Sequence, residues 1–159
     1  MVKTILLVLL TAVVGFIAYV RLAPSDPLVW HIDPVSAPLP TIGGWLVRPD
    51  GGNATSPIWS GDTTATLAAF DAIAMATPRT TRLAGSVDEG RITYVTRSKL
   101  MGYPDYTTVT VAVVANGTAL AIYARQRFGH GDQGVNRARV EAWLAQMPTT
   151  TARDNRLNP

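Results

Sequence analysis

An uninterrupted apolar run near the start of the chain limits what this protein can be more than any other feature. Residues 5–20 read ILLVLLTAVVGFIAYV, contain no charged side chain, and lie between Lys3 and Arg21. A helix that spans a bilayer needs about 20 apolar residues, or about 17 at the short end. Lys3 and Arg21 can extend their long side chains to the headgroups, and Tyr19 suits the interface. The run therefore predicts a transmembrane anchor over residues 1–21.

A cleaved signal peptide is the alternative interpretation of this run. Such a peptide has a hydrophobic region of about 7–15 residues and ends in an Ala-x-Ala-like site. No such site follows, because Arg21 stands two positions before Ala23, and we favour an uncleaved anchor in the lipid bilayer. The basic residues on its two sides nearly balance in the positive-inside comparison. We expect a single-pass protein of a bacterial inner membrane, with the bulk of the chain in the periplasm.

The composition excludes several classes of chemistry. The chain has no cysteine and only two histidines, so disulfide scaffolds, thiol catalysis, iron–sulfur clusters and Cys-bound zinc are ruled out. We expect no metal and no cofactor. The pI is about 9.6, but an anchored chain is a poor candidate for nucleic-acid binding. Ser98, His130 and Asp132 have the side-chain types of a hydrolase triad, yet no Gly-x-Ser-x-Gly elbow surrounds Ser98, so the sequence favours a non-enzymatic protein.

Residues 22–56 are rich in proline and glycine, with prolines at positions 24, 27, 34, 38, 40 and 49. Proline interrupts helices and central strands, so we expect an extended strap with neither a long helix nor a central strand. Three tryptophans, Trp30, Trp45 and Trp59, lie in or just after the strap, and a flexible linker would not carry them. They either pack on the domain's own core or form a partner-binding surface, because tryptophan is enriched at interface hot spots.

The pattern becomes regular over residues 57–147. Asp62 can cap a helix over residues 63–77, and a second apolar stripe at helical spacing predicts a helix over 135–147. Four strands are expected between them, over residues 80–87, 91–100, 106–115 and 118–127, with Asn116-Gly117 as the turn of a hairpin. This order predicts an α+β domain, α-β-β-β-β-α, with a four-stranded antiparallel sheet flanked by two helices. Residues 148–159 form a polar tail.

Basic residues concentrate in the second half of the domain. Residues 91–139 hold seven basic and two acidic side chains, and a glycine-rich loop, FGHGDQG, precedes the last helix. Arginine suits bidentate binding of phosphate or carboxylate, and freed backbone amides at a helix start favour an anion. The candidate anion-binding residues are Arg97, Arg125, Arg127, Arg137 and Arg139. Alternatively these arginines pair with Asp105 and Asp132 and lock the loops; in particular, we expect Arg97 or Arg127 to contact one of these two acids.

Two separated motifs carry a resemblance to a known family. Residues 94–105 read YVTRSKLMGYPD, and residues 125–140 read RQRFGHGDQGVNRARV. Over residues 62–147 the chain resembles the family catalogued as domain of unknown function 1499, bacterial or plastid proteins that are often secreted or membrane-anchored. Ala124 and Gln126 replace serines of the family pattern, and its upstream Pro-Asn-Cys segment has no counterpart. The resemblance implies no reaction. We interpret the shared motif residues as structural: Gly102, Pro104, Asp105, Gly129, Asp132, Gly134 and Asn136, with Asp132 or Asn136 capping the last helix.

The sequence leaves two functions open. The favoured one is a non-enzymatic, membrane-anchored interaction module, such as an accessory subunit of an inner-membrane complex, with the three tryptophans facing a membrane-protein partner. The alternative is an envelope domain that binds an anionic headgroup or a small acid through its arginines. A concave pocket that contains Arg97, Arg125 or Arg127 would favour the second.

Overall fold

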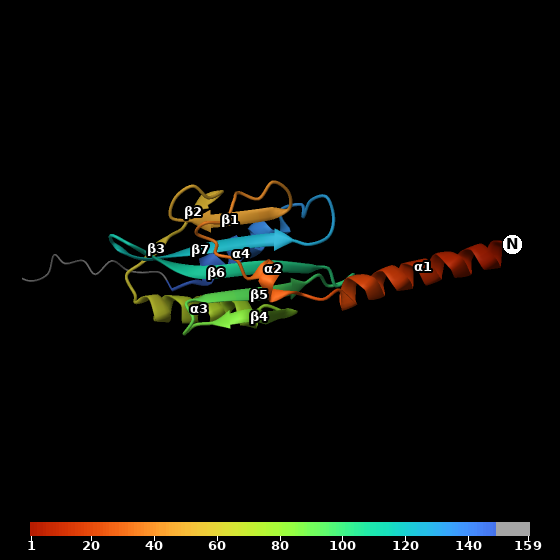
Figure 1. The fold of residues 1–159 in the computed structure, drawn as a ribbon, viewed down its shortest axis with the longest axis horizontal. Coiled ribbons are helices and arrows are strands. Elements are labelled where there is room, and N and C mark those ends of the chain that lie inside the picture. The colour runs from red at the N-terminus through yellow and green to blue at the C-terminus, as the bar shows by residue number, and fades with distance from the viewer. Residues whose placement is uncertain (149–159) are drawn as a thin grey trace, which may run out of the picture.

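The computed structural model describes residues 1–148 and begins with α1 (Val2–Leu22), a helix that projects away from the rest of the chain (Figure 1). Its best window has a mean hydropathy of 2.5 and is only 6% buried by protein. Apolar side chains that the protein leaves uncovered need another apolar surrounding. α1 is therefore long and apolar enough to cross a membrane, although an N-terminal signal sequence would have the same properties.

The domain is built on one sheet of seven strands: β1 (Gly44–Arg48), β2 (Ala54–Thr55), β3 (Ile58–Trp59), β4 (Thr80–Ser86), β5 (Arg91–Arg97), β6 (Pro104–Val114) and β7 (Gly117–Gln126). The strand order is β2-β1-β7-β6-β5-β4, and β3 also pairs with β7. Strands β4 to β7 form the antiparallel meander that the sequence predicted. Val114 pairs with Gly117, so the hairpin turn is Ala115-Asn116, one residue earlier than expected.

The fold is α+β as predicted, but the expectation of a four-stranded sheet was wrong. The three additional strands come from residues 44–59, most of which were assigned to the strap. β1 lies in the proline-free stretch between Pro40 and Pro49 and has a neighbour on each side, β7 and β2. The proline-rich region therefore does contain a central strand, because its prolines lie outside the paired residues. β1 also covers the edge of β7, which would otherwise offer unpaired backbone groups.

Two helices, α3 (Thr63–Ala76) and α4 (Val135–Gln146), cover one face of the sheet (Figure 1). Asp62 caps α3 by accepting hydrogen bonds from the amides of Thr64 and Ala65, as predicted. Phe70 of α3 and Trp143 of α4 meet edge to face, and both rings contact Tyr94 of β5. These buried aromatic rings are the centre of the main hydrophobic core.

The opposite face of the sheet is covered by residues 23–40, which include the one-turn helix α2 (Pro27–Trp30). A second, smaller core forms there from Ala37, Leu46 and Tyr123, with Ile32 beside it. The central strands are consequently buried on both faces, and seven consecutive residues of β7 are buried. This covering segment, and not the helices, determines what the outward-facing arginines of β7 contact.

Candidate functional site

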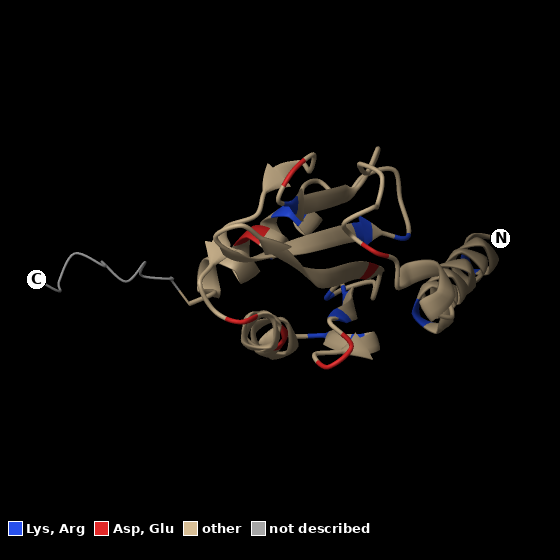
Figure 2. Ribbon diagram, turned by 60° about the vertical axis from the view of Figure 1, so that its left-hand side comes forward, with Lys and Arg blue, Asp and Glu red and all other residues tan. Residues whose placement is uncertain are grey.

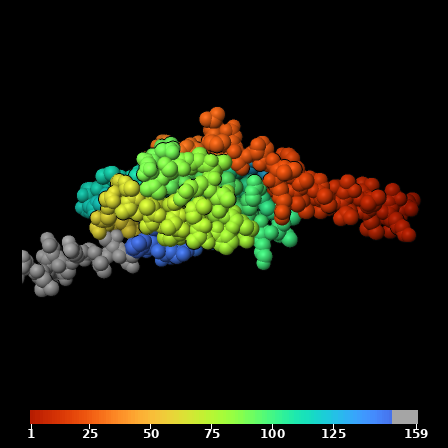
Figure 3. Space-filling model, turned by 90° about the horizontal axis from the view of Figure 1, so that it is seen from below, coloured from red at the N-terminus to blue at the C-terminus, as the bar shows by residue number. Residues whose placement is uncertain are grey.

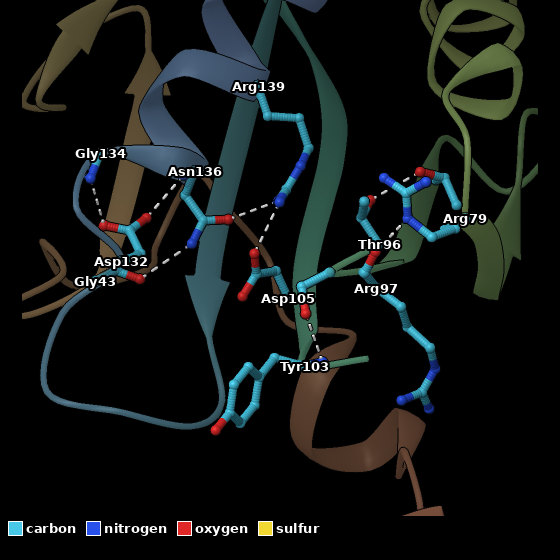
Figure 4. A network of polar contacts seen from close by, with 12 residues as sticks. Gly43, Arg79, Thr96, Arg97, Tyr103, Asp105, Asp132, Gly134, Asn136 and Arg139 are labelled. Atoms are coloured by element: carbon cyan, nitrogen blue, oxygen red, sulfur yellow. Dashed lines mark hydrogen bonds and ion pairs between the residues drawn. The ribbon is translucent and has the colours of Figure 1, made fainter. Parts of the chain in front are cut away.

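Several of the motif residues form one polar network at the start of β6 and of α4 (Figure 4). Arg139 donates to the Asp105 carboxylate at 2.8 Å, and the two side chains are only 12% and 15% exposed. Arg139 also donates to the side-chain oxygen of Asn136, which is itself fully buried. Burial raises the pKa of Asp105, and the charge and hydrogen bond of Arg139 oppose that rise. The pair therefore ties α4 to the first residues of β6.

The glycine-rich loop before α4 is closed by Asp132. Its two carboxylate oxygens accept hydrogen bonds from the amides of Gly134, the N-cap residue, and of Asn136 in the first turn of α4. Gly134 has a left-handed φ of 82° that suits glycine. The Asn136 amide then donates to the carbonyl of Gly43, just before β1. The loop is held by contacts within the chain, and its helix N-terminus is already occupied by a carboxylate.

The expectation that Arg97 or Arg127 contacts Asp105 or Asp132 was wrong. Arg139 makes that contact instead, because it lies one helical turn after Asn136 and reaches across to β6. Arg97 donates to the carbonyl of Gly102, and Arg127 donates to Tyr106 and to a carbonyl of the covering segment. The alternative reading, in which arginines lock the loops through these acids, applies to Arg139.

Arg125 of β7 holds the covering segment against the sheet. Its guanidinium carbon lies 4.9 Å from the ring centre of Trp30 and 4.7 Å from that of Tyr123. It also donates to the Trp30 carbonyl at 2.7 Å. Trp30 in turn stacks on Tyr106 with ring centres 3.8 Å apart. Burial lowers the pKa of Arg125, and the two aromatic faces and a carbonyl take the place of a carboxylate partner.

The five arginines predicted as one anion site are therefore not brought together. Arg125 and Arg127 hold residues 24–30, and Arg139 pairs with Asp105. Arg137 lies over the Trp45 ring and pairs with Glu141 on the surface of α4. Of the five, Arg97 lines the basic cavity described below. Arg125 and Arg127 alternate onto the same face of the sheet, but a segment of the same chain occupies that face.

The three tryptophans are engaged within the chain. Trp59 is 7% exposed and belongs to the main core. Trp45 is half-buried and packs against that core, and Trp30 stacks on the opposite face of the sheet. These contacts match the first of the two readings, in which the tryptophans pack on the domain itself.

Two of the three residues considered for a hydrolase triad make structural hydrogen bonds. The Ser98 hydroxyl accepts a hydrogen bond from the Tyr103 amide, and Asp132 caps α4. Within residues 1–148 no hydrogen bond joins Ser98, His130 and Asp132. That part of the chain also contains no cluster of three or more His, Asp or Glu side chains able to hold a metal.

A basic cavity lies where α1 meets the domain, and we call it the anchor pocket. It has a volume of about 570 Å³ and is lined by Arg21, Arg79, Thr81, Arg97, Ser98, Lys99 and Gly102. Four of these seven residues are cationic, none is acidic, and among residues 1–148 no ion pair neutralises the four. Figure 2 shows several basic segments on the strands and loops at this end of the domain. The pocket is thus a region of uncompensated positive charge.

Local hydrogen bonds hold the three arginines of the anchor pocket in place. Arg79 has a left-handed φ of 62°, uncommon for a residue with a side chain, and its Nε donates to the Arg97 carbonyl at 3.0 Å. Arg97 donates to Gly102, and Arg21 donates to the Leu100 carbonyl. Each guanidinium keeps further N–H groups that these bonds do not use. Such forks are suited to the oxygens of a phosphate.

Sequence reasoning found Arg97 but not Arg21, Arg79 or Lys99 as members of this site. Arg21 was interpreted only as the end of the anchor, and Arg79 was not singled out. The signal that could have found them is the loop KLMGYP after β5. It begins with Lys99, follows Arg97 closely, and lies at the end of the sheet where β4 begins, next to Arg79.

Comparison with known proteins gives a family and nothing narrower. No curated protein and no solved structure matches the chain. The family model for a protein of unknown function, DUF1499, matches residues 33–147. This span includes β1 to β7 and both covering helices, and also the network of Asp105, Asp132, Asn136 and Arg139. The chain, with its sheet, its two helices and the polar network between them, belongs to the DUF1499 family.

Proposed function

We propose that this protein is a membrane-anchored domain that binds a phosphate-bearing anionic group, the headgroup of an anionic lipid, in the anchor pocket. The observation that carries the proposal is the set of four cations around one cavity at the base of α1, without an acidic residue in the lining. We further propose that α1 stays attached as a single-pass anchor in a bacterial inner membrane, with the domain on the periplasmic side. The anchor pocket would then stand at the level of the lipid headgroups.

The lining fits a phosphate ester in charge and in hydrogen bonding. Arg79, just before β4, is paired with Arg97 at the end of β5, because the Arg97 amide donates to the Arg79 carbonyl. Because both residues line the same cavity, each guanidinium can donate to a phosphate bound there. The hydroxyls of Thr81 and Ser98 in the same lining add donors for its remaining oxygens. A small carboxylic acid offers fewer acceptor oxygens to the same groups.

Binding of short-chain lipids to the full-length protein in detergent tests this proposal. We expect dihexanoyl phosphatidylglycerol to bind more tightly than dihexanoyl phosphatidylcholine, and inorganic phosphate to compete weakly. Arg79→Gln and Arg97→Gln should each weaken binding by about tenfold, since a hydrogen bond to a charged group contributes about 1.5–3 kcal/mol. Arg137→Gln, on the exposed surface of α4, is the matched control and should leave binding unchanged.

Equal binding of the two lipids, or equal affinities of all three variants, would contradict the proposal. Arg97 also supports the loop through Gly102, so its variant is checked by thermal unfolding. Arg79→Gln, at an exposed residue, separates loss of charge from loss of fold.

A second candidate function is the interaction module, an accessory subunit of a membrane complex. The observation that favours it is on α2, where Leu28 is 91% and Val29 54% exposed. Adjacent apolar side chains held outward on a fixed turn are typical of a partner contact. Affinity purification of full-length wild type and of Leu28→Asp from native membranes tests it. A stable partner that the variant loses would support an accessory subunit, and identical profiles would argue against one at α2.

A further inference from the structure

The last two turns of α1 are contacted by two loops of the domain. Phe16 meets Tyr103 edge to face with ring centres 6.4 Å apart, and Tyr19 meets Phe128 at 5.9 Å. Tyr103 and Phe128 also contact one another at 6.0 Å. Tyr103 belongs to the loop between β5 and β6, and Phe128 to the loop between β7 and α4. These four rings, which we call the aromatic collar, join the anchor to the domain.

The rise of an α-helix gives the position of Tyr103 along the axis of α1 from these contacts. An α-helix rises 1.5 Å per residue, so Phe16 lies about 9 Å below Leu22 along the axis, and its side chain leans further toward the N-terminus. Even if the whole 6.4 Å between the Phe16 and Tyr103 rings lay along the axis, Tyr103 would stand about 3 Å below the end of the helix. The 21 residues of α1 span about 32 Å, close to the 30 Å of a hydrocarbon core. Tyr103 therefore lies below the outer boundary of the lipid.

The tip of the β5–β6 loop carries the most exposed apolar side chain of the sheet loops. Leu100 is 82% exposed and lies between Lys99 and Met101. The loop is closed by hydrogen bonds between Ser98 and Tyr103, and Arg21 holds the Leu100 carbonyl. In the space-filling view the segment around residue 100 projects beside the base of α1 (Figure 3). A leucine held outward next to a spanning helix has lipid as its apolar surrounding.

We infer that the loop of residues 98–103 dips into the bilayer beside the anchor, with Leu100 in the acyl chains and the aromatic collar at the interface. The partner of this surface is the lipid bilayer itself, because the surface is continuous with α1. Tyrosine is favoured at the interface, and a lysine beside a buried leucine can extend its amine to the headgroups. The inference rests on the proposed anchoring by α1, but it does not require that the anchor pocket bind a lipid.

The chain has no cysteine, so single-cysteine variants can be labelled at one site each. Leu100→Cys carries an environment-sensitive fluorophore in the full-length protein, reconstituted in vesicles of phosphatidylcholine alone. Val113→Cys is the matched control: it is 80% exposed, and nine residues of extended β6 place it about 30 Å from Pro104. Val14→Cys, in the middle of α1, marks the depth of the anchor.

We expect the label at position 100 to emit at shorter wavelength than the label at 113, and to be quenched several-fold more by lipids with a nitroxide near the headgroup. The label at 113 should be quenched by aqueous iodide. A label at 100 that behaves like the label at 113, while position 14 is quenched by lipid, would overturn the inference and leave the anchor intact. If position 14 is not quenched by lipids with a nitroxide deep in the acyl chain, the anchor and the inference both fail. Because these vesicles hold no anionic lipid, either result is independent of the anchor pocket.

Discussion

Replacing Arg139 by Met should destabilise the domain strongly, because it leaves the Asp105 carboxylate buried without a partner. Arg139 donates to Asp105 and to Asn136, each at 2.8 Å, and Asp105 is 15% exposed. Removal of one partner from a buried ion pair costs about 3–5 kcal/mol, much more than the pair contributes in net terms. At a urea dependence of about 2 kcal/mol per M, the unfolding midpoint should fall by about 2 M.

The pH dependence of the Arg139→Met variant follows from the same carboxylate. Burial already raises the pKa of Asp105, and Arg139 is what opposes the rise, so the variant should have a higher folded-state pKa. A folded pKa above the unfolded one stabilises the fold at low pH and loses that effect as pH rises through the folded pKa. The loss in free energy of unfolding of the variant, relative to wild type, should therefore be largest near pH 7 and decrease as the pH is lowered.

Urea unfolding of the full-length protein in detergent, followed by tryptophan fluorescence, measures this prediction. Arg137→Met is the control on the same helix, because the Arg137–Glu141 pair is more than half exposed on both sides and should contribute at most about 0.5 kcal/mol. The double variant Asp105→Asn with Arg139→Met should recover part of the lost stability. A midpoint for Arg139→Met within 0.3 M of wild type (about 0.6 kcal/mol), or a deficit that does not depend on pH, would refute the reasoning.

Three further outcomes are expected. Gly85→Ala should cost several kcal/mol in urea unfolding, because Gly85 has a φ of +79° and an added Cβ would stand 2.0 Å from the Arg91 carbonyl oxygen; a loss below about 1 kcal/mol would contradict this. Arg125→Met should increase hydrogen exchange in residues 23–37 but not in α3, since Arg125 holds Trp30 through its carbonyl and ring; unchanged exchange there would contradict this role. Burial and the charge of Arg91 lower the pKa of His31, so the stability that neutral His31 provides is present above its unfolded pKa and falls as pH drops through the folded one; His31→Gln should remove that part of the acid sensitivity, and an unchanged pH profile would argue against it.

Local patterns were sufficient to predict the meander of β4 to β7 and both helices. Asp62 and the stripe around Trp143 are signals that act within a few residues, and the structure contains the elements they predicted. The prediction for the proline-rich region was wrong because proline density over 35 residues does not exclude a short strand: β1 needs only the five residues Gly44–Arg48, which lie between two prolines. Its partner, β7, is remote in sequence, and no local pattern predicts that pairing.

The candidate site was harder to predict, because its members come together only through the tertiary fold. Arg21 ends the anchor, Arg79 follows α3 and Lys99 follows β5. Strand alternation puts Arg125 and Arg127 on one face of the sheet, but it does not show that Trp30 lies over Arg125. The chemistry of the side chains could be predicted from the sequence, but which segment covers the sheet face that carries Arg125 could not.

The pairing of β1 with β7 sets an order on folding as the chain is made. Gly44 faces Arg125 and Val47 faces Ile122, so the edge of β1 that faces β7 stays unpaired until nearly all of the domain has been synthesised, whereas its other edge can pair with β2 earlier. Contacts this far apart in sequence form slowly. Until then the segment with Trp45 and Leu46 remains an open β edge, tethered close to the membrane by α1. A chaperone that shields this edge during synthesis would have to act before β7 emerges, and its binding site would disappear when the sheet closes.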